Sequence, residues 1–157
     1  MNYWERLKAM RLNSMQRRLE RYKMIYTWKT LEGLVSNSGV KLYENERKGR
    51  LCQIPSHKSK VESIKTIRDN SFQVSGPTLF NLLPRDLRGL TNCGPVEFKT
   101  RLDEFLCLIP DQPKCAQMTP VAMKPHASNS LIYQVAWARR EGLLNSCGYW
   151  DLYGLLF

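Results

Sequence analysis

The chain has 157 residues, a hydrophobic content of 43%, an aromatic content of 10% and a formal net charge of +10. This length suits one domain or a domain fragment, and the hydrophobic fraction argues against wholesale disorder. No apolar run is long enough to span a bilayer, and the first residues lead into a charged helix rather than a signal peptide. We therefore expect an intracellular protein, nuclear or cytoplasmic, with no membrane partner.

The positive charge is concentrated in the first half of the chain. Residues 1–68 contain sixteen Lys and Arg against six Asp and Glu, whereas residues 69–157 contain eight of each kind. A strongly basic segment attracts polyanions and suits contact with a phosphate backbone. A solubilising surface, or a face covered by another domain, would give the same composition.

The N-terminal segment, residues 3–35, predicts two helices with a break near Asn13 and with Ser14 as the N-cap of the second helix. The apolar positions of the second helix recur with a period near 3.6 and predict a stripe that faces the core. They are Met15, Leu19, Tyr22, Ile25 or Tyr26, Trp28 and Leu31. The basic residues interleave with aromatic ones whose faces could stack on bases, but we favour core positions for Tyr22, Tyr26 and Trp28.

The next segment, residues 40–70, gives a mixed signal. Residues 44–50 are highly charged and favour a solvated loop, although this basic cluster could also reach a duplex backbone. Residues 51–54 could form a short strand. We favour β structure over Lys65–Val74, while the recurrence of Val61, Ile64 and Ile67 leaves a helix open.

The remaining segments are predicted to be helical. A short helix is expected after Pro77, followed by a turn at Pro84. The clearest helix covers residues 95–108, ends before Pro110, and has an apolar face formed by Val96, Phe98, Leu102, Phe105 and Leu106. Residues 114–128 are expected to be a linker, and residues 129–157 a last helix from about Leu131 to Leu144, capped by Asn129 or Ser130, with an apolar tail, Tyr149–Phe157. The expected fold class is mainly α with a possible small β element, in a fragment-like helical domain.

Residue patterns typical of catalytic and metal sites are missing. The five cysteines include no Cys-x-x-Cys pair, and neither His57 nor His126 belongs to a zinc-binding spacing, so we expect no metal ligands and free thiols. There is no Gly-x-Ser-x-Gly and no phosphate-cradling glycine-rich loop. We expect no catalytic residues, no cofactor and no independent enzymatic activity.

Several short motifs occur in a fixed order along the chain. Gly76–Pro84 reads GPTLFNLLP and is followed by Leu87-Arg88, and Phe98–Leu106 reads FKTRLDEFL and is followed by Ile109–Pro113, IPDQP. This order resembles the tail that follows the reverse-transcriptase domain in LINE-type (non-LTR) retrotransposon polyproteins, with its pattern GP-x-LFN-x-LP-x-x-LR and then FK-x-x-LD-x-FL-x-x-IPD-x-P. Tyr3–Leu7 and Ser14–Tyr22 are also similar to an N-terminal helix of that family.

The resemblance implies a division of the chain and a role. Residues 1–113 would correspond to the thumb or post-thumb C-terminal region, with a basic helical part, 1–68, and a neutral part, 69–113. The parent family is an RNA-directed DNA polymerase whose metal site needs a Tyr-x-Asp-Asp turn. This chain has no Asp-Asp pair, so we expect no polymerase activity. The implied partners are an RNA or DNA backbone and the rest of a reverse transcriptase.

The predicted nucleic-acid contacts are basic residues of the first half, which would grip phosphates without reading sequence. They are Arg17, Arg18, Arg21, Lys23, Arg47, Lys48 and Arg50. The alternative is a decayed or domesticated transposon remnant that acts as a protein-interaction module or has no selected function. The apolar tail, Tyr149–Phe157, mildly favours this alternative.

Overall fold

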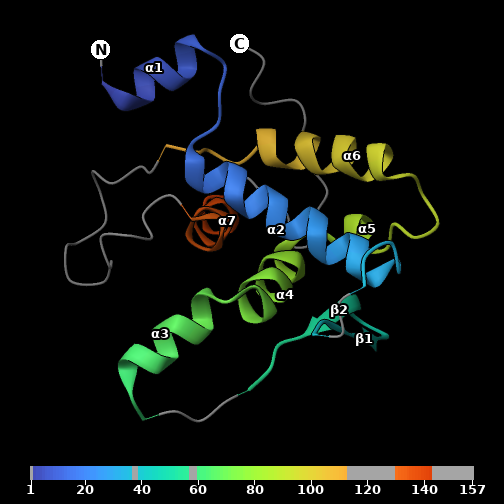
Figure 1. The fold of residues 1–157 in the computed structure, drawn as a ribbon. Helices are drawn as coiled ribbons and strands as arrows, with labels where there is room; N and C mark the ends of the chain where they lie inside the picture. The colour runs from blue at the N-terminus through green and yellow to red at the C-terminus, as the bar shows by residue number, and fades with distance from the viewer. Residues whose placement is uncertain (1, 37–38, 57–59, 113–129, 143–157) are drawn as a thin grey trace. The chain divides into compact units, whose positions relative to one another are not determined.

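The computed structural model describes residues 2–36, 39–56, 60–112 and 130–142 (Figure 1). Within these residues the fold is mainly α with one small two-stranded antiparallel sheet, as the sequence predicts. The elements are α1 (Tyr3–Ala9), α2 (Met15–Leu31), β1 (Lys41–Asn45), β2 (Gly49–Gln53), α3 (Glu62–Asn70), α4 (Phe72–Leu82), α5 (Arg85–Arg88), α6 (Pro95–Cys107) and α7 (Leu131–Arg140).

The chain divides into two compact units. The central unit is the continuous segment Tyr22–Asp103. The terminal unit takes residues from both sides of that segment, and its described residues are 2–21, 104–112 and 130–142. The predicted linker, 114–128, and the apolar tail, Tyr149–Phe157, lie outside the described residues.

The first helices of the terminal unit begin where the sequence predicts. Asn2 and Glu5 form a reciprocal capping box on α1, with the Glu5 amide donating to Asn2 Oδ1 at 2.9 Å. After α1 the chain turns through Arg11, whose φ is +53°. Ser14 Oγ then accepts the backbone N–H of Arg17 at 3.1 Å, so the predicted break and N-cap are both confirmed.

The last helix of the terminal unit is capped by a side chain from α2. The Glu20 carboxylate accepts the Leu131 amide at 2.9 Å and the Ser130 hydroxyl at 2.6 Å, which places negative charge at the N-terminus of α7. Helix α7 begins at Leu131 as predicted but ends at Arg140, before a left-handed Gly142 with φ of +72°. Ser130, one of the two predicted caps, is the N-cap residue of α7, but its hydroxyl donates to Glu20 and forms no cap hydrogen bond itself.

The central unit has an aromatic core. Trp28 and Phe98 are fully buried and stack with ring centroids 4.5 Å apart and an interplanar angle of 8°. The indole Nε1–H of Trp28 donates to the Leu90 carbonyl oxygen at 3.0 Å, so its polar atom is satisfied. Phe80 and Leu83 are also buried. In α6, Val96 is exposed, because it lies in the first turn of the helix, outside the buried face.

Two side chains anchor the β-hairpin of the central unit. Asn81 of α4 bonds to both backbone groups of Cys52, accepting its N–H at 2.8 Å and donating to its carbonyl oxygen at 2.9 Å. Arg88 donates to the carbonyl oxygens of Arg50 and Lys48, at 2.8 and 2.9 Å. The short strand predicted at 51–54 is confirmed as β2, paired with β1 so that Leu42 faces Cys52.

The predicted β structure at Lys65–Val74 is wrong. This stretch forms the end of α3 and the start of α4, which meet at Ser71. The three-residue recurrence of apolar residues reflects a helix, α3, whose side chains are exposed apart from a half-buried Arg68. Helix α4 also begins five residues before Pro77, which lies buried inside it. A proline there removes one backbone N–H from the helix without ending it.

Candidate nucleic-acid interface

Arg17 does not lie on the surface as a phosphate contact would. It is only 1% exposed within the terminal unit. Its Nη1 donates to the carbonyl oxygens of Leu106 and Ile109 at 3.3 and 3.2 Å, and its Nη2 donates to that of Pro110 at 2.8 Å. The Leu106 carbonyl lies in the last turn of α6, where it also accepts the Ile109 N–H at 3.2 Å, and the other two carbonyls follow the helix. The structure corrects the prediction, since the guanidinium group of Arg17 binds the end of a helix instead of an external anion.

Acidic side chains compensate the buried charge of Arg17. Burial lowers the pKa of the Arg17 guanidinium, while the Asp111 and Glu20 carboxylates act in the opposite direction. Asp111 Oδ1 lies 3.8 Å from Arg17 Nε and also accepts the Ser14 hydroxyl at 2.6 Å. Arg17, Asp111 and Ser14 therefore form one internal polar network.

Arg50 also forms an ion pair within the protein. Both of its terminal nitrogens donate to Glu32 Oε1 at 3.0 Å, and both side chains of this pair are 12% exposed. Arg50 is half-buried and, unlike Arg17, is not enclosed by the protein, so its role as a phosphate contact stays a prediction. The neighbouring Arg47 and Lys48 are exposed at the turn between β1 and β2.

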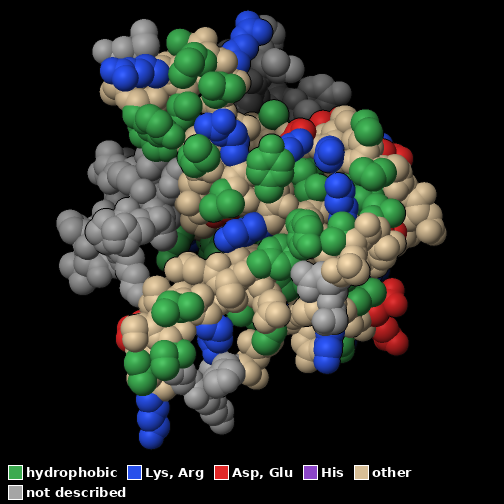
Figure 2. Space-filling view, viewed as in Figure 1, with side chains coloured by type: hydrophobic (Ala, Val, Ile, Leu, Met, Phe, Trp, Pro, Cys, Tyr) green, Lys and Arg blue, Asp and Glu red, His purple; other side chains and the backbone are tan. Residues whose placement is uncertain are grey.

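The other predicted contacts on α2 remain accessible. Arg18 is exposed, and Arg21 and Lys23 are half-buried. More generally, of the fifteen Lys and Arg residues in positions 1–68 that the structure describes, nine are exposed, five are half-buried and Arg17 alone is buried. On the visible face, Lys and Arg side chains, in blue, are interspersed with green hydrophobic ones (Figure 2).

The stripe predicted to face the core along α2 is only partly buried: Ile25 and Trp28 lie in the core, whereas other members of the stripe face solvent. Tyr22 is 64% exposed and Tyr26 is 40% exposed, and Met15 and Leu19 are exposed as well. The buried positions of the helix include Arg17, Glu20, Met24, Ile25, Thr27 and Trp28. Of the three aromatic residues predicted to lie in the core, only Trp28 does. Sequence periodicity missed this because several buried positions are polar.

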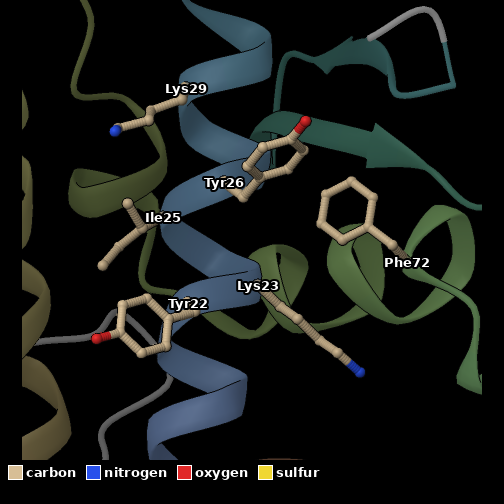
Figure 3. A pocket seen from close by; sticks show the side chains of 6 residues that line it. All are labelled: Tyr22, Lys23, Ile25, Tyr26, Lys29 and Phe72. Carbon is tan, nitrogen blue, oxygen red and sulfur yellow. The ribbon is translucent and has the colours of Figure 1, made fainter. Parts of the chain in front are cut away.

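The exposed aromatic residues of the central unit line an open groove of about 340 Å³ (Figure 3). Its six lining residues are Tyr22, Lys23, Ile25, Tyr26, Lys29 and Phe72. Tyr26 and Phe72 meet edge to face, with ring centroids 5.0 Å apart and an interplanar angle of 82°. Lys23 and Lys29 also line the groove, and no acidic residue does. This arrangement combines flat aromatic surfaces with positive charge.

The described residues also bear on metal binding and thiol chemistry. Among them, no group of three His, Cys, Asp or Glu side chains could hold a metal ion. The described cysteines, Cys52, Cys93 and Cys107, are free thiols, and burial raises the pKa of Cys52 to about 11. His57 and His126 lie outside the described residues. No helix in the described part of the chain is long and apolar enough to cross a membrane.

Comparison of the chain with protein-family models, with curated proteins and with solved structures finds no match of any of these kinds.

Proposed function

We propose that this chain is a non-catalytic segment, similar to the C-terminal region of a LINE-type reverse transcriptase, that binds the phosphate backbone of nucleic acids. The observation that carries the proposal is the accessibility of its basic side chains. All but one of the fifteen described Lys and Arg residues in positions 1–68 are exposed or half-buried, although this segment also supplies core residues such as Trp28.

Accessible cations favour a polyanion for a simple physical reason. Each Lys or Arg that neutralises a phosphate releases condensed counterions, and this gain in entropy supplies most of the non-specific affinity for nucleic acid. The contacts position the strand but read no sequence. Of the predicted contacts, the proposal keeps those that are exposed or half-buried, which are Arg18, Arg21, Lys23, Arg47, Lys48 and Arg50.

The motifs behind the family resemblance have internal structural roles. Asn81, from the GPTLFNLLP motif, holds Cys52 of β2, and Arg88 holds the backbone of Lys48 and Arg50. Leu79, Phe80, Leu83 and Leu87 are buried. The motif residues therefore support the turn that presents Arg47 and Lys48. This is consistent with a segment that builds a scaffold for basic side chains.

The test is a fluorescence-anisotropy titration of the monodisperse chain with a labelled RNA–DNA hybrid at several salt concentrations. We expect log–log plots of the association constant against salt to be linear and steep, with a slope of about −0.9 per phosphate contact. Changing Arg18, Arg47 and Lys48 together to Gln removes three cations. This variant should bind more weakly, and its salt dependence should be shallower, with a less negative slope.

A matched control changes Arg139 and Arg140, two exposed cations of the charge-neutral half, to Gln. The slope measured for this control should differ from that of the unmodified chain by no more than about 0.9, the value of one phosphate contact. If a folded chain shows no binding, or if the triple variant and the control behave alike, the basic segment does not bind phosphates. A role as a protein-interaction module or a transposon remnant would then be favoured.

A further inference from the structure

The groove of the central unit has a chemical character that phosphate binding alone does not use. Three of its six lining side chains are aromatic, two are lysines and one is Ile25. Tyr22 exposes 64% of its surface and Tyr26 exposes 40%, and both rings border one groove together with Phe72 and Ile25 instead of being scattered singly. A ligand that covered these rings would bury apolar surface and meet positive charge at the same time.

We propose that this groove binds an unpaired nucleic-acid strand by stacking its bases on Tyr22 and on the Tyr26–Phe72 pair. The inference rests on the proposed function and adds a preference for single strands. Every base has a flat π face, but in a duplex these faces are already stacked on neighbouring base pairs. Aromatic side chains on a protein surface therefore select strands whose bases are free, whatever their sequence.

The geometry of α2 supports such stacking. Tyr22 and Tyr26 are four residues apart, so they lie one above the other on the same face of the helix. The edge-to-face contact with Phe72 of α4 holds the Tyr26 ring in place at a centroid distance of 5.0 Å. In Figure 3, Tyr22 and the Tyr26–Phe72 pair flank the groove at two levels along the helix. Two bases of one strand could thus find two separate stacking surfaces.

The lysines supply the charge that a strand requires. Lys23 and Lys29 extend in opposite directions from the helix, so that the rings lie between their ammonium groups (Figure 3). A strand crossing the rings would pass near positive charge on both sides. No acidic side chain lines the groove to oppose a polyanion. This positive charge favours a nucleic-acid strand as the occupant over a protein surface that carries no acidic residues.

The test compares two probes at one salt concentration. One is a labelled oligothymidylate of about a dozen nucleotides, whose bases stack weakly on one another, and the other is a fully paired duplex of the same length. We expect the unmodified chain to bind the single strand more tightly. Changing Tyr22 and Tyr26 to Ala should weaken single-strand binding at least about fivefold for each stacked base lost. The affinity for the duplex and the salt slope should stay unchanged.

Two further variants separate stacking from other effects. Changing Tyr22 and Tyr26 to Phe keeps the rings and should retain single-strand binding, whereas changing Lys23 and Lys29 to Gln should lower the salt slope. Tyr133→Ala removes an exposed tyrosine of α7 in the terminal unit and serves as the matched control. Because Tyr26 packs on Phe72, the Tyr22→Ala variant alone tests the ring that lies outside this pair.

The outcomes distinguish this inference from the proposed function. If the chain binds the duplex but the Tyr-to-Ala variants bind the single strand as well as the unmodified chain does, the groove does not stack bases, although phosphate binding stands. An equal loss in the Phe variants would also overturn the inference, because the rings would then not be responsible. If neither probe binds the folded chain, the proposed function itself fails.

Discussion

Replacing Arg17 tests whether a buried cation stabilises the terminal unit. The Arg17→Ala variant removes the guanidinium group that bonds to the carbonyl oxygens of Leu106, Ile109 and Pro110. It also leaves the Asp111 carboxylate, 3.8 Å from Arg17 Nε, without this cation. We expect the variant to have a lower free energy of unfolding, because the contacts between α2 and the end of α6 are lost.

The magnitude follows from those contacts. A hydrogen bond from a charged donor contributes about 1.5–3 kcal/mol, and removing one member of a buried ion pair costs about 3–5 kcal/mol. Asp111 is 19% exposed and keeps its bond to the Ser14 hydroxyl, so water offsets part of this cost. We therefore expect Arg17→Ala to lower the free energy of unfolding by about 3 kcal/mol. Arg17→Lys keeps the charge but loses the planar guanidinium group that reaches several carbonyl oxygens at once. We therefore expect about half that loss in the free energy of unfolding.

The assay is urea unfolding followed by far-UV circular dichroism at a fixed pH. The control is Arg18→Ala, which removes an exposed arginine one residue away and should change stability by about 0.5 kcal/mol or less. With a urea m-value of about 1–3 kcal/mol/M, the two midpoints should differ by roughly 1 M or more. If Arg17→Ala and Arg18→Ala unfold at the same urea concentration, Arg17 does not hold the end of α6 and the reasoning is refuted.

Three further changes probe the central unit. A Cβ at Gly76 would lie 2.7 Å from Thr27 Oγ1, so Gly76→Ala should destabilise the chain by about 1–3 kcal/mol in thermal unfolding, and an unchanged melting temperature would contradict this. Asn81→Leu removes both bonds to the Cys52 backbone; we expect a loss of about 1–3 kcal/mol and faster hydrogen exchange of the Cys52 amide. Burial raises the pKa of Cys52 from 9.0 to about 11, so at pH 8 iodoacetamide should modify the exposed Cys107 first. The stability that Cys52 contributes through its protonated thiol should be fully present below pH 9.0 and lost as the pH rises through about 11.

Local signals were sufficient for much of the helical fold. Ser14 caps α2, and Pro95 begins α6, because caps and first-turn prolines act within a few residues of themselves. The strand prediction at Lys65–Val74 failed for a related reason. An apolar residue at every third position fits a helix. However, every residue from Glu62 to Ile67 is exposed, so this stretch lacks the buried apolar stripe that would have distinguished a helix from a strand in the sequence.

The face that α2 buries could not be predicted from local pattern. Periodicity assigned Tyr22 and Tyr26 to the core, whereas the structure buries Arg17, Glu20 and Thr27 in their place. Burial of Arg17 and Glu20 depends on partners about ninety and 110 residues further along the chain. No window of sequence contains both members of such a pair. The groove lined by the exposed Tyr22 and Tyr26 was missed for the same reason.

The discontinuous terminal unit has a consequence for the order in which the protein can fold during synthesis. Arg17 and Ser14 leave the ribosome early, but their partners at Ile109 and Asp111 follow 92 and 97 residues later. At about 5–20 residues per second, the first helices would wait roughly 5–20 s for those partners, while the whole central unit is synthesised. A chain that stops before Asp111 would therefore lose a contact of Ser14, the N-cap of α2, nearly a hundred residues upstream of the missing end.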